Sequence, residues 1–185
     1  ADQAQAKRLL LEDCTLDAAN PSNFTNGFEG HDVTMRRCKI LNVVDGIDVK
    51  NHHNGYKDGP VDVYVEACYI DELAFFSPEP LQSDQKTHND GVQIMGGSNI
   101  NFTGNWITGM LGTAGSYDPS IPPPAGGQAN AAFMISPTSG NITNVHILNN
   151  WLGGGSYTTN ISNHNSVSLG YIGEINNNKF ARNQN

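Results

Sequence analysis

The stretch DGVQIMGGSNINFTGNWI, residues 90–107, decides the fold of this chain. It alternates apolar and polar residues twice, first at Val92 and Ile94 and then at Ile100 and Phe102, a pattern typical of short β-strands. A Gly-Gly-Ser corner separates the two runs, and Asn105 follows the second. Because Gly and Asn tolerate the backbone angles of tight corners, the stretch predicts strand, corner, strand, corner.

The second strand and its corner recur along the chain as apolar-x-apolar-x-x-[Asn or Cys]-x-apolar. The six corner residues are 24 to 45 residues apart and are Cys14, Cys38, Cys68, Asn105, Asn150 and Asn178. A constant motif with variable spacing indicates a repeat protein whose insertions fall in loops. From the second repeat on, a further strand is predicted before the motif, at Phe28, Ile47 and Val49, Val92 and Ile94, Phe133 and Ile135, and Val167 and Leu169.

Two other arrangements compete with this prediction. Residues 2–11 have a helical period and would form a short helix capping one end. An antiparallel β-sandwich would also use many short strands, but it does not explain six matches to one asymmetric motif.

The composition agrees with an all-β protein. The chain has 185 residues, of which 15% are charged and 20 are Gly. Its formal net charge of −8 argues against a nucleic-acid partner, because phosphate binding needs a basic surface. No stretch is long and apolar enough to span a membrane. We expect a single domain over residues 1–185, as part of a longer chain, because the start Ala-Asp-Gln-Ala-Gln is not a signal peptide and does not resemble a natural N-terminus either.

The repeated unit V-x-I-x-x-N-x-I resembles the right-handed parallel β-helix superfamily, which includes pectate-lyase-like enzymes, polygalacturonase-like hydrolases and phage tailspike proteins. The resemblance implies a solenoid of about six coils in which the corner residues stack inside the chain as a ladder. The three Cys at the ladder position would be reduced core thiols. Polygalacturonase-like enzymes carry an Asn-Thr-Asp triplet, an Asp-Asp pair and a Gly-His-Gly, and none is present here. Asn89-Asp90-Gly91 is only a fragment of such a pattern. Pectate lyases use a Lys or Arg base and acidic calcium ligands, and neither has a motif local enough to identify from this sequence.

The repeat assigns outward residues to columns that run across neighbouring repeats. Two residues before the corner lie Glu12, Arg36 and Glu66, with Asp13 and Arg37 one column over. The alternating signs favour a cross-strand charge ladder over a pair of substrate-binding arginines.

The column one residue after the corner gathers Tyr69, Trp106 and Trp151. An outward aromatic row predicts a flat platform on which sugar rings stack, so these three are candidate substrate-binding residues. Protein interfaces favour the same residue types. The Pro-rich insertion at 108–130 begins beside Trp106, and cover by this loop or by a second chain is the alternative.

Acidic side chains gather in the columns of the first strand. The cluster would span three repeats and comprises Glu29, Asp45, Asp48 and Asp90, with Lys50, His88 and Gln93 at its edge. Carboxylates held close together raise one another's pKa or bind a cation. The candidate catalytic residues are therefore Asp90, Asp45, His88 and Lys50. Gln93 is a further substrate-binding candidate, and Glu29 and Asp48 are candidate calcium ligands.

This cluster is open to three interpretations. A carboxylate pair suits glycoside hydrolysis. Carboxylates with calcium and Lys50 suit β-elimination. Alternatively, Asp45-Gly46 and Asp90-Gly91 only form corners, with the Asp side chains capping backbone N–H groups.

Two functions follow as expectations. The first is a polysaccharide lyase or glycoside hydrolase acting on an acidic cell-surface or wall glycan through the acidic cluster. The second is a non-catalytic glycan-binding module, or a structural β-helix of a phage tail, that uses the aromatic row. Both place the protein outside the cell, secreted or in a virion, with a polysaccharide partner and a homotrimer or larger virion assembly.

Overall fold

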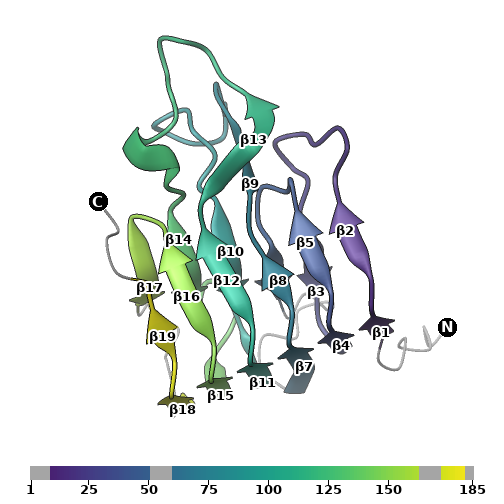
Figure 1. The fold of residues 1–185 in the computed structure, drawn as a ribbon. Coiled ribbons are helices and arrows are strands. Elements are labelled where there is room, and N and C mark those ends of the chain that lie inside the picture. Colours follow the sequence, from purple (N-terminus) through teal and green to yellow (C-terminus); the bar gives the residue numbers. More distant parts are fainter. Residues whose placement is uncertain (1–8, 51–59, 163–171, 182–185) are drawn as a thin grey trace, which may run out of the picture.

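The computed structural model describes residues 9–50, 60–162 and 172–181. Within these ranges the chain is built from β-strands in parallel sheets, with one 3-10 helix, η1 (Ala125–Gly127). Figure 1 shows three long sheets, which we call A, B and C, and a two-stranded sheet that extends beyond them. No helix in the described part of the chain is long and apolar enough to cross a membrane.

Sheet A holds the strands that lead into the predicted corners. In spatial order they are β1 (Leu9–Glu12), β4 (Val33–Arg36), β7 (Pro60–Glu66), β11 (Gly97–Thr103), β15 (Ile142–Leu148) and β18 (Gly173–Asn176). Sheet B holds the strands that follow the corners. These are β2 (Thr15–Asp17), β5 (Lys39–Leu41), β8 (Tyr69–Ile70), β12 (Trp106–Gly109), β16 (Trp151–Gly154) and β19 (Lys179–Phe180).

Sheet C holds the strand that precedes each sheet A strand from the second repeat on. Its members are β3 (Phe28–Gly30), β6 (Ile47–Val49), β10 (Asp90–Ile94), β14 (Ala131–Ile135) and β17 (Tyr157–Ile161). The two-stranded sheet pairs β9 (Leu73–Phe76) with β13 (Leu111–Ser116). The chain thus visits sheets C, A and B in turn, which is compatible with a parallel β-helix and confirms the all-β prediction.

The strand pairing has the register that the repeat predicts. Val63 lies beside Val33 on one side and Ile100 on the other, and Ile100 lies beside Val145. In sheet B, Ile107 likewise lies beside Ile70 and Leu152. Because side chains alternate along a strand, this register turns every apolar residue of the motif to the same face.

The core lies between the three sheets. Phe102 from sheet A, Ile107 from sheet B and Phe133 from sheet C have no solvent exposure. The rings of Phe102 and Phe133 meet edge to face, with centroids 5.0 Å apart. Such pairs are favoured by the ring quadrupole, which adds to the burial of apolar area.

Two expectations concern the ends of the chain. The structure adds β17 to sheet C, where Thr159 lies beside Phe133 of β14. The predicted strand at Val167 and Leu169 lies outside the described residues. The helix expected over residues 2–11 is wrong at residues 9–11, which belong to strand β1 because they pair with β4. Residues 2–8 of the expected helix lie outside the described residues.

The corner residues form the predicted ladder. The backbone N–H of Cys68 donates to Oδ1 of Asn105 at 2.8 Å, and the N–H of Asn105 donates to Oδ1 of Asn150 at 2.9 Å. Asn150 is linked in the same way to Asn178 at 2.9 Å. In the Cys half, the N–H of Cys38 lies 3.4 Å from Sγ of Cys68, and the three Cys are free thiols. From Cys38 on, the rungs therefore bond to backbone groups that the corner would otherwise leave unpaired.

The residue before each rung has a left-handed backbone in all six repeats. These residues, which we call the corner ridge, are Asp13, Arg37, Ala67, Gly104, Asn149 and Asn177, with φ between 52° and 69°. A left-handed backbone costs most residues about 1–2 kcal/mol, because their Cβ clashes with the following carbonyl oxygen. Gly has no Cβ, and Asn and Asp tolerate this conformation better than other residues. The pattern thus explains the Asn-Asn and Gly-Asn pairs at the last three corners.

We expect Ala67→Gly to raise the free energy of unfolding by about 1 kcal/mol, because φ of Ala67 is 52° and Gly adopts this angle without strain. Gly104→Ala should have the opposite effect of similar size, since a Cβ there meets nothing within 4 Å and only backbone strain is added. Urea unfolding of both variants measures the two changes. Destabilisation by Ala67→Gly would contradict the left-handed corner.

Candidate functional site

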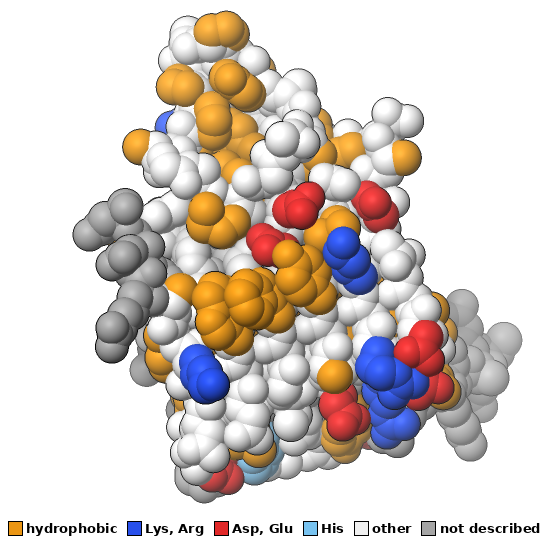
Figure 2. Space-filling model, in the orientation of Figure 1, with side chains coloured by type: hydrophobic (Ala, Val, Ile, Leu, Met, Phe, Trp, Pro, Cys, Tyr) orange, Lys and Arg blue, Asp and Glu red, His pale blue; other side chains and the backbone are white. Residues whose placement is uncertain are grey.

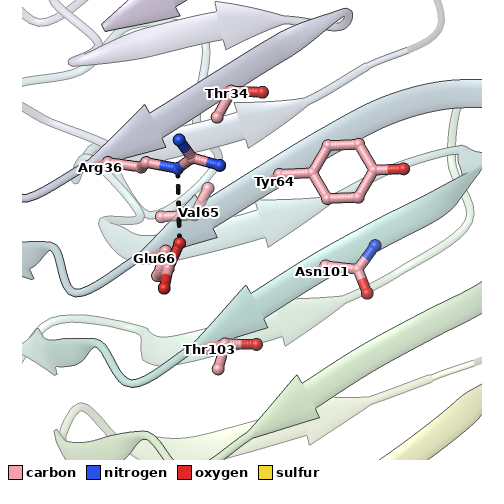
Figure 3. Close-up of a pocket in the computed structure, with 7 residues that line it drawn as sticks. All are labelled: Thr34, Arg36, Tyr64, Val65, Glu66, Asn101 and Thr103. Carbon is pink, nitrogen blue, oxygen red and sulfur yellow. Dashed lines mark ion pairs between the residues drawn. The ribbon is translucent and has the colours of Figure 1, made fainter. Parts of the chain in front are cut away.

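A polar groove of about 380 Å³ runs across the outer face of sheet A. Its lining side chains come from three adjacent strands, β4, β7 and β11, and include Thr34, Arg36, Tyr64, Glu66, Asn101 and Thr103. Figure 3 shows them projecting from one face of these strands, with Tyr64 beside Asn101. We call this the sheet A groove. Its floor is rigid because each strand is paired on both sides.

The sheet A groove offers hydroxyl, amide, carboxylate and guanidinium groups around one aromatic ring. Arg36 and Glu66 lie opposite one another, with Nε and Oε2 3.4 Å apart (Figure 3). Arg37 binds Glu12 at 3.0 Å and Asp13 at 2.7 Å. The predicted cross-strand charge ladder is confirmed, and because these pairs are exposed each contributes little to stability.

Tyr64 and Asn101 were not among the predicted site residues. Both lie four residues before a corner, in a column that also faces outward, and the register pairs them directly. The repeat would therefore have placed them together. The repeat pattern does not predict the depth of the groove, because that depth depends on the sizes of side chains from three repeats.

The aromatic row is present on the outer face of sheet B. Figure 2 shows a band of hydrophobic side chains across the face that carries β8, β12 and β16. The rings of Trp106 and Trp151 are stacked 3.7 Å apart at an angle of 4°, and Tyr69 lies 6.2 Å from Trp106 at 17°. The Nζ of Lys39 lies 5.5 Å from the centre of the Tyr69 ring, in cation–π range.

These rings form a stack with its edges outward, not the predicted flat platform. Parallel strands in register place Tyr69, Trp106 and Trp151 one above the next, so their faces cover each other. The edge of Trp151 rests over Gly153, where an added Cβ would lie 2.5 Å from the ring. The insertion at 108–130 does not bury the aromatic row. Its strand β13 pairs with β9, and the side chain of Trp106 stays 39% exposed.

Asp90 and Asp45 are brought together, as predicted, but in a closed setting. The N–H of Asp90 donates to Oδ1 of Asp45 at 2.7 Å, and Asn130 donates to Oδ1 of Asp90 at 3.0 Å. Asp90 is only 2% exposed. Burial raises the pKa of Asp90 to about 8, with the charge of Asp48 adding to the effect. Burial also raises the pKa of Asp45, helped by the charges of Asp48 and Asp90.

This geometry favours the corner interpretation of Asp45 and Asp90. Their oxygens accept from backbone and amide groups of neighbouring repeats, as capping residues do. A neutral carboxyl at pH 7 would suit a general acid, yet a side chain that is 2% exposed does not reach a bound polysaccharide.

Lys50 lies between Glu29 and Asp48, at 3.0 and 3.2 Å from their oxygens. Asn26 donates to the same two oxygens at 3.2 and 3.1 Å. Burial alone would lower the pKa of Lys50, but the charge of Asp48 and hydrogen bonds to both carboxylates outweigh it, and the pKa is raised. Lys50 is therefore a cation at neutral pH.

The position of Lys50 between Glu29 and Asp48 bears on whether these two residues fit a calcium ion. Calcium takes six to eight oxygen ligands that converge on one point. Here the carboxylate oxygens converge on the Lys50 ammonium group. Among the residues that the structure describes, no group of three or more His, Cys, Asp and Glu side chains could hold a metal ion. As arranged, the pair does not fit calcium.

The remaining candidates lie at the edge of the acidic cluster. His88 turns to Asp84, with its Nε2 3.1 Å from both carboxylate oxygens, and not to Asp90. It lines a pocket of about 160 Å³ together with Asn130, the residue that binds Asp90. Gln93 lies beside Asp48 in sheet C and is half-buried.

Comparison of the chain with protein-family models, with curated proteins and with solved structures finds no match. No family is assigned to the chain on this basis.

Proposed function

We propose that this chain is a glycan-binding module built as a right-handed parallel β-helix of about six coils. Six corner motifs, three parallel sheets and the order in which the chain visits them support this architecture. The handedness follows from chain chirality, since parallel crossover connections are right-handed in about 98% of cases. The stacked Asn rungs agree with the resemblance to this superfamily.

The sheet A groove is the observation that carries the proposal. Sugars present hydroxyls that both donate and accept, together with apolar ring faces. Asn101, Thr34 and Thr103 supply matching donors and acceptors, and Tyr64 supplies an aromatic surface. The volume of about 380 Å³ lies in the usual range of small-ligand sites. The groove is open to the surface.

Binding is favoured over cleavage by the acidic cluster itself. A lyase needs a base, whereas the raised pKa of Lys50 keeps it protonated. A hydrolase needs two accessible carboxyl groups, whereas in this cluster only Glu29 is exposed, Asp45 is half-buried, and Asp48 and Asp90 are each 2% exposed. The proposed role is therefore recognition of a polysaccharide outside the cell. Assembly into a homotrimer or a larger virion structure stays a prediction. A measurement of the mass of the protein in solution tests it.

The test is a panel of bacterial and plant polysaccharides offered to the wild type and to Tyr64→Ala. We expect one class of glycan to bind and Tyr64→Ala to weaken it about tenfold, since aromatic anchors dominate such sites. Calorimetry measures affinity, while unsaturated uronate absorbance and new reducing ends report any cleavage. Tyr117→Ala is the matched control, because Tyr117 is 55% exposed and lies outside the groove.

Binding to none of the glycans would contradict the proposal, as would equal losses in the two Tyr variants. Product formation that Asp90→Asn abolishes would replace binding by catalysis. Circular dichroism of each variant separates loss of the groove from loss of the fold.

A further inference from the structure

A second groove, of about 720 Å³, lies around the corner from the sheet A groove. We call it the corner groove. The side chains that define its chemistry are Trp106, Trp151, Asn149, Asn177 and Lys179. Asn149 and Asn177 belong to the exposed corner ridge, and their amides stand outside the buried ladder.

The corner groove has a local charge opposite to that of the chain. Among the described residues that line it, Lys179 is the only charged one and none is acidic. This contrasts with the formal net charge of −8. Lys179 is exposed and lies beside Trp151 in the pairing of β16 with β19. A positive group in an amide-lined groove attracts an anion.

The orientation of the rings strengthens the same preference. The face of an aromatic ring is negative and its edge is positive. In this stack the faces are turned to one another, and Lys39 binds over Tyr69 at one end of the row. Tyr69 and Trp151 stack on the two faces of Trp106, so Trp106 meets the groove with its edge. An indole edge, two amides and one ammonium group together suit an anionic oxygen group better than a neutral sugar face.

The two grooves have consecutive residues of the chain in their linings, Thr103 and Gly104. Thr103 lines the sheet A groove and Gly104 lines the corner groove. The corner ridge is lowest at this repeat, because Gly104 has no side chain and a Cβ there would meet nothing within 4 Å. A ligand that lies on sheet A can therefore pass over the ridge at this point.

We propose that the corner groove binds the acidic groups of the same glycan chain that occupies the sheet A groove. This rests on the proposed function and specifies it, because it makes the ligand an acidic polymer long enough to cross the ridge at Gly104. Lys179 binds the carboxylate or sulfate group of the polymer, and the Asn149 and Asn177 amides bind adjacent sugar oxygens.

The test uses polygalacturonate and its methyl ester, which share a backbone and differ in charge. Both Trp residues of the chain line the corner groove, so Trp fluorescence reports its occupancy. We expect polygalacturonate to change the emission, to bind less tightly as salt is added, and to bind more tightly than the ester. Lys179→Met should weaken binding about three- to tenfold. Binding should also strengthen with oligomer length until both grooves are filled.

Lys39→Met is the matched control, because Lys39 sits over Tyr69 at the other end of the row and does not line the groove. Equal effects of the two Lys variants would overturn the inference, and so would binding that is indifferent to the ester. Tyr64-dependent binding without a change in Trp emission would overturn it while leaving the proposed function standing. Failure of every glycan to bind would overturn both.

Discussion

Asn105→Leu is expected to lower the free energy of unfolding by about 3–5 kcal/mol. Asn105 is 2% exposed and uses both ends of its amide. It accepts from the N–H of Cys68 at 2.8 Å and donates to the carbonyl of Val65 at 3.0 Å and to Asn150 at 2.9 Å. Leucine would leave the Cys68 N–H and the Val65 carbonyl unpaired in the core, at about 1–3 kcal/mol for each group. Urea unfolding monitored by far-UV circular dichroism measures the loss.

The chain supplies a matched control for this substitution. Asn105→Cys introduces the residue that already occupies the ladder in three repeats, where the N–H of Cys38 lies 3.4 Å from Sγ of Cys68. It should cost clearly less than Asn105→Leu, because a thiol is a weak acceptor and a small apolar group. Gln93→Ala, outside the core, should change stability by less than about 0.5 kcal/mol. A silent Asn105→Leu would show that the ladder does not hold the corner.

Stability is expected to fall as the pH rises from about 4 to about 8, because of Asp90. Its pKa is about 8 in the folded protein and near 3.8 in the unfolded chain, so the folded state holds a proton that the unfolded state releases. A raised pKa stabilises the fold below the unfolded value and loses that contribution as the pH passes through the folded value. For one group the slope approaches about 1.4 kcal/mol per pH unit.

Asp90→Asn isolates this contribution. The amide keeps the acceptor for Asn130 and carries no titratable proton, so the stability of the variant should fall less steeply between pH 4 and pH 8. Unfolding at constant ionic strength across this range gives the difference between the two proteins. Asp118→Asn controls for an exposed carboxylate, whose pKa is lowered by its hydrogen bond with Ser120. Parallel pH profiles for wild type and Asp90→Asn would mean that Asp90 is ionised in the folded protein.

The acidic cluster shows that sequence patterns predict which residues are neighbours but not how far each is buried. The column rule correctly placed Asp45 beside Asp90 and Glu29 beside Asp48. It could not show that Asp90 is buried beside Asn130, or that Asp48 is buried beside Asn26 and Lys50, while Glu29 stays exposed. Burial of an outward residue depends on which long side chains of other repeats lie over it, and these are far away in sequence. In the structure the residues of this cluster form hydrogen bonds at the corners and ion pairs with Lys50.

The last repeat shows a second limit. The structure places Tyr157–Ile161 beside β14, with Tyr157 next to Ala131 and Ile161 next to Ile135, a pairing that the motif alone does not predict. The predicted strand at Val167 and Leu169 lies outside the described residues.

By itself the sequence determined the corner, the register and the columns. Two properties of the motif are local: side chains alternate with a period of two, and a small amide or thiol follows a left-handed residue. Six copies of this motif allow only one alignment of the strands with one another. Only the tertiary structure decided that the aromatic row is a stack with its edges outward, that Tyr64 and Asn101 line a groove, and that Asp90 is enclosed. Ring orientation, groove depth and burial are set by contacts between repeats that lie 24 to 45 residues apart, and no local pattern contains them.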